Sequence, residues 1–118
     1  MPEVKATREG LVGQRTASGW IIDANYPFVA LPARRALGRW VRIYNPLNFK
    51  ICAAQVLDVG PFNTDDDAYV FGDARPLAES NKSVSGQGTN GAGIDLGEKV
   101  WSLLEMKDNT IVQWDFLQ

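Results

Sequence analysis

Two aspartates, Asp58 and Asp95, are the residues of this chain whose types and positions best suit catalysis. Asp58 ends an apolar run just before Val59-Gly60-Pro61, and Asp95 follows Ala92-Gly93-Ile94 directly ahead of an expected helix. A carboxyl group held against apolar neighbours has a raised pKa and can act as a general acid. Two carboxyl groups that flank a groove are the minimum needed to cleave a glycosidic bond. Commoner roles stay open for both residues, since aspartate often caps helices and often forms turns.

The composition excludes several other catalytic chemistries. The 118 residues include no histidine, which excludes Ser-His-Asp catalysis, Cys-His catalysis and every histidine-ligated metal site. Cys52 is the single cysteine, so an intrachain disulfide and a thiolate zinc cluster are excluded as well. We expect the Cys52 thiol to be buried and inert. We therefore expect neither a metal nor a cofactor.

Three further motifs are better explained as structure than as binding sites. Residues 86–91 match the pattern GxGxxG, but no buried strand precedes them and no βαβ pattern surrounds them. Asp65-Asp66-Asp67 fits no EF-hand spacing and is typical of a solvated acidic loop. The arginines of residues 34–42 lie near aromatic residues, as is typical of a half-exposed strand. Because the net charge is also −2, we expect no nucleic-acid partner.

Period-two alternation and turn residues predict a mainly β chain. Strands are expected over residues 15–22, 39–45, 50–59 and 110–117, the middle two joined as a hairpin. Strand parity in the third of these places Asp58 on a packed face with Cys52, Ala54 and Val56.

One principal helix is expected at about 96–106, because leucine and valine recur there at helical spacing. A long polar loop is expected at about 62–93. These elements together predict a small β-barrel with one helix before the last strand.

The sequence predicts no membrane insertion, because no segment is apolar for 18 residues. The first ten residues mix acids and bases and lack the apolar core of a signal peptide. We therefore expect a protein that is cytoplasmic as made. A phage or prophage origin, with action at the cell wall after release, would fit the missing signal.

Four segments, in this order, resemble RlpA-like proteins. Thr16-Ala-Ser-Gly-Trp20 is similar to the opening TASGW strand of that family, and residues 36–45 are similar to its PFGTxVRVTN strand. Residues 56–62 are similar to VNDRGPF, and residues 93–96 are similar to the start of RVIDLS and its following helix. The resemblance implies the double-psi β-barrel superfamily, which includes expansins, barwin-like proteins, family-45 endoglucanases and MltA-type lytic transglycosylases. It implies a six-stranded double-psi β-barrel over residues 14–118, preceded by an N-terminal extension at residues 1–13.

The resemblance also implies roles for single residues. Asp95 matches the aspartate that donates a proton in family-45 glucanases, and Asp58 matches the aspartate beside it in the groove. Thr16 matches a position on the first strand that lines the same groove. Trp20 and Tyr44 are expected to position sugar rings.

Three departures from the family pattern stand out. Residues 31–35 contain no histidine, Val59 stands where the family has arginine, and the connection over residues 62–93 replaces a short loop. An acid-only mechanism of the MltA kind remains compatible with these changes.

The sequence therefore supports two hypotheses for the barrel, and it leaves open a third in which the strip Arg34–Arg42 contacts a nucleic-acid or protein partner. In the first, the protein acts on cell-wall glycan, namely peptidoglycan, as a lytic transglycosylase with an aspartate general acid. Such an enzyme needs no water-activating base, because the sugar's own 6-hydroxyl attacks. In the alternative, the barrel is a non-catalytic glycan-binding or structural module. Whether turnover occurs is left open at this point, and a monomer is expected in either case.

Overall fold

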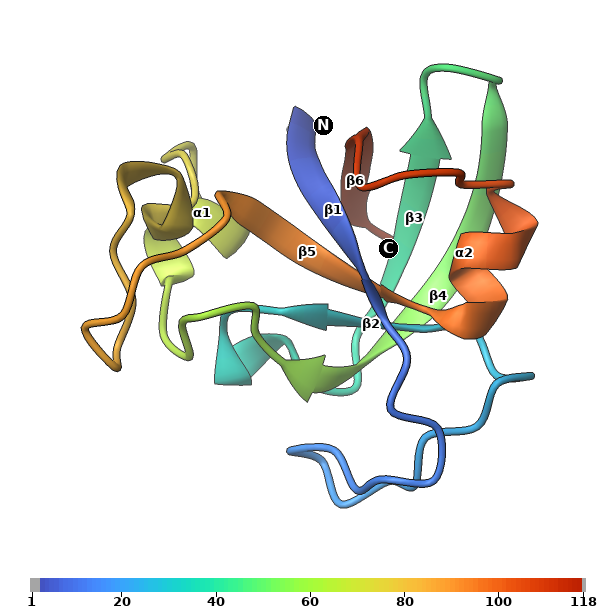
Figure 1. Cartoon of the computed structure of the whole chain (residues 1–118), viewed down its shortest axis with the longest axis horizontal. Coiled ribbons are helices and arrows are strands. Elements are labelled where there is room, and N and C mark those ends of the chain that lie inside the picture. Colours follow the sequence, from blue (N-terminus) through green and yellow to red (C-terminus); the bar gives the residue numbers. More distant parts are fainter. Residues whose placement is uncertain (1–2, 118) are drawn as a thin grey trace.

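Within residues 3–117, which the computed structural model describes, six strands close into one barrel (Figure 1). Around the barrel the order is β1-β5-β2-β4-β3-β6, and β6 pairs with β1 to close it. The strands are β1 (Glu3–Glu9), β2 (Phe28–Leu31), β3 (Trp40–Asn45), β4 (Lys50–Val59), β5 (Ala92–Gly97) and β6 (Ile111–Phe116). The mainly β, six-stranded barrel of double-psi type that the sequence predicts is confirmed.

Two short α-helices and two 3₁₀ turns lie in the connections of the described chain. They are η1 (Arg34–Ala36), α1 (Asp67–Val70), η2 (Leu77–Ser80) and α2 (Glu98–Leu103). The principal helix is shorter than the expected 96–106, because Leu96 belongs to β5 and packs in the core. The long connection also agrees with the prediction, since α1 and η2 both lie between β4 and β5.

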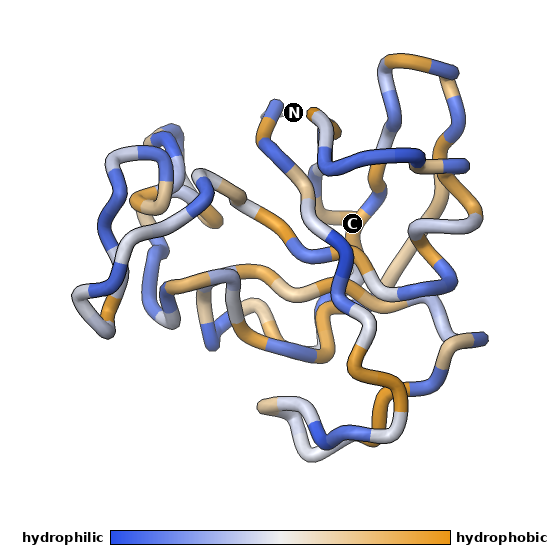
Figure 2. Tube along the Cα trace, in the orientation of Figure 1, coloured by the Kyte–Doolittle hydropathy of each residue, from blue (hydrophilic) through white to orange (hydrophobic). Residues whose placement is uncertain are grey.

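The barrel core is built by strand alternation. Val41 and Ile43 on β3 are fully buried, whereas Trp40 and Arg42 face outward. Figure 2 shows the hydrophobic colour recurring along the barrel strands. The same alternation on β1 buries Val4 and Ala6 in the core, and this orients the neighbouring side chains of β1 away from the core.

The first strand of the barrel differs from the prediction. The family resemblance places residues 1–13 in an N-terminal extension, yet residues 3–9 form β1 and pair with both β5 and β6. The strand expected over residues 15–22 is instead part of the loop between β1 and β2, with one isolated bridge from Arg15 to Ile21. The barrel gains more by burying Val4 and Ala6 than by pairing a segment that holds three small or turn-forming residues in a row.

Two register shifts bend the sheet where the functional side chains lie. On β4, Val56 pairs with Val29 and Asp58 pairs with Ala30, so Leu57 is an extra residue. On β5, Ala92 pairs with Lys5 and Ile94 with Ala6, which leaves one extra residue between them. A bulge of this kind moves every later side chain of the strand to the other face.

Candidate functional site

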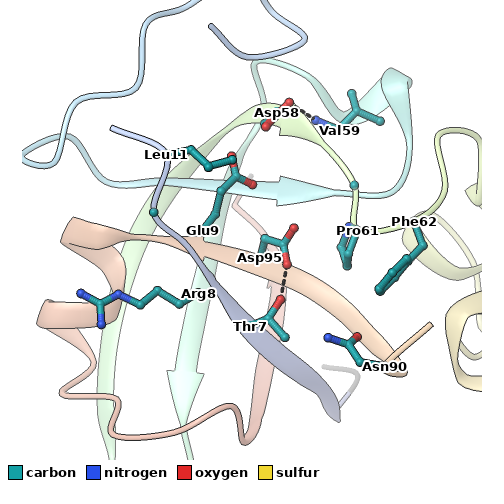
Figure 3. A pocket seen from close by; sticks show the side chains of 12 residues that line it. Thr7, Arg8, Glu9, Leu11, Asp58, Val59, Pro61, Phe62, Asn90 and Asp95 are labelled. Carbon is teal, nitrogen blue, oxygen red and sulfur yellow. Dashed lines mark hydrogen bonds between the residues drawn. The ribbon is translucent and has the colours of Figure 1, made fainter. Parts of the chain in front are cut away.

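A pocket of about 550 Å³ lies where β1, β4 and β5 approach one another (Figure 3). Three carboxyl groups line it, those of Glu9, Asp58 and Asp95. The remaining lining is formed by Thr7, Arg8, Gly10, Leu11, Val59, Gly60, Pro61, Phe62 and Asn90. The structure therefore brings together the two aspartates that the sequence singled out.

Strand pairing explains why the two aspartates meet. Asp95 on β5 and Asp58 on β4 are both paired with Ala30 of β2, one from each side. Asp95 is paired in turn with Thr7 on β1. Neighbouring strands lie about 4.8 Å apart, so one short row across four strands holds Thr7, Asp95, Ala30 and Asp58.

Asp95 lines the pocket, and a hydrogen bond holds one of its two carboxyl oxygens in place. The Thr7 hydroxyl donates a hydrogen bond to Asp95 Oδ1. Burial raises the pKa of Asp95 to about 6, the hydrogen bond from Thr7 opposes this rise, and the negative charge of Asp58 adds to it. A carboxyl group with this pKa exchanges its proton readily near neutral pH.

Asp58 lies on the opposite face from the one that strand parity predicted. The extra residue Leu57 turns Asp58 away from the packed face of Cys52, Ala54 and Val56 and toward the pocket. Two backbone amides donate to Asp58 Oδ1, from Ala17 at 3.0 Å and from Val59 at 2.8 Å. These two donors fix the carboxylate at the pocket edge.

Glu9 is the pocket carboxyl group that sequence reasoning missed. Its side chain leaves the end of β1 toward Asp58 in Figure 3, and the residue is only 8% exposed. Glu9 Oε2 is buried and has no hydrogen-bond partner among the described residues. Burial, the adjoining Asp58 side chain, and the charges of Asp58 and Asp95 raise the pKa of Glu9 to about 9. The alternation of Val4 and Ala6 with polar residues was the signal that could have identified this strand and its carboxyl group.

The other predicted binding residues lie outside the pocket lining. The Thr16 hydroxyl is 2.9 Å from the Ser18 hydroxyl, and only the neighbouring amide of Ala17 reaches the site. Trp20 packs against Tyr26 and Phe28 at centroid distances of 5.5 and 5.0 Å. Tyr44 lies on β3, paired with Ile51. Thr7, in place of Thr16, is the threonine that contacts Asp95.

Arg8 lies at the pocket but does not neutralise it. Its guanidinium makes two hydrogen bonds to Glu98, at 2.8 and 2.6 Å, and lies 5.6 Å from the centre of the Trp101 ring. Figure 3 shows this side chain directed away from the three carboxyl groups. The acidic pocket thus keeps its charge imbalance.

Neither a metal-binding cluster nor a membrane-spanning helix is found among residues 3–117. No group of three or more His, Cys, Asp and Glu side chains in this range is placed to hold a metal ion. None of the helices in the same range is long and apolar enough to cross a membrane.

The fold and site together define a closed, six-stranded barrel of double-psi type with an acidic pocket beside its parallel strand pairs. The chain belongs to the family described as "Domain of unknown function (DUF8814)", whose model matches residues 2–115. No curated protein matches the sequence. Among solved structures, the chain is similar to the Streptomyces papain inhibitor (SPI), with a TM-score of 0.57 and 18% sequence identity. That likeness covers 99% of this chain and 96% of the other, and at this identity it shows the fold.

Proposed function

We propose that this protein acts on cell-wall glycan, with peptidoglycan as substrate, and that Asp95 is its general acid. The observation that carries the proposal is the position of Asp95, which lines an open pocket with Thr7 bound to one carboxylate oxygen. The raised pKa of about 6 keeps about half of Asp95 protonated at pH 6 and about a tenth at pH 7, far more than for an ordinary aspartate. The resemblance to RlpA-like segments supports glycan as the substrate class.

The proposed reaction is that of a lytic transglycosylase. Asp95 gives its proton to the glycosidic oxygen, and the C1–O bond breaks with its electron pair moving to that oxygen. The 6-hydroxyl oxygen of the same sugar then bonds to C1, and the hydroxyl proton passes to the Asp95 carboxylate. The acid is thereby restored, no water is consumed, and the product carries an anhydro-sugar end.

Asp95 suits the acid role better than Glu9. A general acid works best when its pKa lies near the working pH, and the pKa of Glu9 is about 9. Glu9 therefore holds its proton throughout the neutral range. Asp58 remains as a charged neighbour that favours the protonated form of Asp95.

The test is digestion of purified peptidoglycan followed by mass analysis of the products. Turnover with anhydro-sugar ends supports the proposal, whereas new reducing ends would indicate a hydrolase, which needs a second carboxylate to position water. Asp95→Asn should abolish turnover, and Asp73→Asn is the matched control because Asp73 is an exposed aspartate outside the pocket. Full activity of Asp95→Asn would overturn the proposal.

The same experiment also distinguishes two non-enzymatic functions, glycan binding and protease inhibition. Retention of the protein on peptidoglycan with no new ends would favour the non-catalytic glycan-binding module. The Streptomyces neighbour is named as a papain inhibitor, so inhibition of papain is measured in parallel. Inhibition without glycan binding would point to a protease partner instead of a polysaccharide.

A further inference from the structure

Glu9, Asp58 and Asp95 share one pocket without a cation from the protein. In the described residues none of the three carboxyl groups forms an ion pair, while Arg8, the arginine on the pocket lining, is bound to Glu98. Carboxylates that share a site repel one another and are stabilised by an opposite charge within about 4–6 Å. The pocket is therefore complementary to a positively charged group from a ligand.

The second, independent observation is the unused hydrogen-bonding capacity of Glu9. Glu9 is more than nine-tenths buried, and its Oε2 atom has no partner among residues 3–117. A buried polar atom without a partner is costly for the folded protein, so a donor from a ligand in the pocket would relieve that cost. The partner of an ionised carboxylate oxygen must be an N–H or O–H donor.

A primary ammonium group fits these oxygens better than a metal ion does. The carboxyl groups are not placed for joint coordination of a metal. An ammonium group presents three N–H donors in different directions, so a single group has donors for Glu9 and for a second carboxylate. The pocket volume of about 550 Å³ has room for a ring beside the ammonium group. Leu11, Pro61 and Phe62 supply apolar surface for that ring.

We propose that the Glu9 end of the pocket binds the ammonium group of an amino sugar, so that the preferred glycan carries free amino groups in place of N-acetyl groups. This inference rests on the proposed function, because it names the substrate class of the same site. An amino sugar is favoured over a lysine side chain because the cation site and Asp95 line one pocket. A sugar ring seated there places its glycosidic bond beside the proposed acid.

Binding of the cation must be accompanied by proton release. Free Glu9 is protonated at pH 6, since burial and the adjoining carboxyl groups hold its pKa at about 9. The groups that face it are Asp58 on β4 and Asp95 on β5. A bound ammonium group favours the ionised form, so Glu9 releases up to one proton, and Asp95 adds to this release.

The experiment is calorimetric titration at pH 6 with the glucosamine trimer, the N-acetylglucosamine trimer and a lysine tripeptide. Each titration is carried out in two buffers of different ionisation enthalpy, which gives the number of protons released. We expect the glucosamine trimer to bind at least tenfold more tightly than the acetylated trimer, with net proton release. In Glu9→Gln the preference should fall to less than threefold and the proton release should drop, while Asp73→Asn should leave both unchanged.

The outcomes separate this inference from the proposed function. Equal affinity for the two trimers, or a preference that Glu9→Gln leaves intact, would overturn the inference even if peptidoglycan is cleaved. Binding of the lysine tripeptide alone would replace the amino sugar by a protein partner. A glucosamine preference that depends on Glu9 would support the inference even where no glycan turnover is found. Circular dichroism of Glu9→Gln ensures that a lost preference does not reflect unfolding.

Discussion

Glu9→Gln should make the protein more stable at neutral pH, although it removes a titratable group from a candidate site. Gln has nearly the same shape as protonated Glu and cannot ionise. The pKa of Glu9 rises from 4.5 to about 9 on folding, chiefly through burial. The folded state therefore binds more protons than the unfolded state between these two values, and the free energy of unfolding falls as the pH rises through this window.

The size of the effect follows from the width of that window. From pH 4.5 to pH 7 the free energy of unfolding of the wild-type protein falls by up to about 1.4 kcal/mol per pH unit. The total loss of stability over this range is therefore at most about 3 kcal/mol. Water in the open pocket screens part of this. We expect Glu9→Gln to equal the wild type near pH 4.5 and to exceed it by about 1–2 kcal/mol at pH 7.

Urea unfolding, followed by the fluorescence of the four tryptophans, measures this difference between pH 4.5 and pH 7.5. Asp73→Asn serves as the control for loss of one exposed carboxylate, and its curve should run parallel to that of the wild type. If the Glu9→Gln curve also runs parallel to the wild-type curve, Glu9 is ionised in the folded protein and the reasoning about its burial is refuted. The comparison requires no substrate, so it tests the site independently of any activity.

Three further changes test other parts of the site. Asp95→Asn should abolish glycan turnover yet be at least as stable as the wild type at pH 7, because ionising the buried carboxyl at its raised pKa costs free energy; urea unfolding shows whether it is instead destabilised. Thr7→Val should raise the pKa of Asp95 further, since it removes the hydrogen bond that lowers it, and the alkaline limb of the pH–activity profile, or an NMR titration of the carboxyl, should move upward rather than stay in place. Gly97→Ala should destabilise the fold by about 2–3 kcal/mol, because a Cβ at Gly97 would overlap the Phe28 ring, whereas Gly10→Ala meets only an ordinary contact and should change the melting temperature little.

Strand alternation made part of this fold predictable from the sequence. β3 was predicted at nearly its observed bounds because Val41 and Ile43 alternate strictly with larger, exposed residues. β1 is missed from the sequence because charged or polar residues flank Val4 and Ala6 on both sides, so the segment lacks the apolar density of the other strands. The family resemblance over Thr16–Trp20 favours a first strand in this segment, which the structure shows to be a loop.

The candidate site was predictable to the same limited extent. The sequence singles out Asp58 and Asp95, and the structure places both on the lining of one pocket. The sequence predicts the wrong face of β4 for Asp58, because no glycine or proline marks the bulge at Leu57. The extra residue is visible only in the pairing of β4 with β2. Glu9 could not be found without β1, since its burial depends on strands that are distant in sequence.

The bulge at Leu57 brings Asp58 and Asp95 onto one pocket lining. If Leu57 were regularly paired instead of bulged, Asp58 would share the face of Val56 and place a carboxylate in the barrel core, which is strongly unfavourable for a charge without a partner. With the bulge, Asp58 pairs with Ala30, which is also the pairing partner of Asp95. The negative charge of Asp58 then raises the pKa of both Asp95 and Glu9. One inserted residue thus determines the geometry of the pocket and also the protonation of the groups within it.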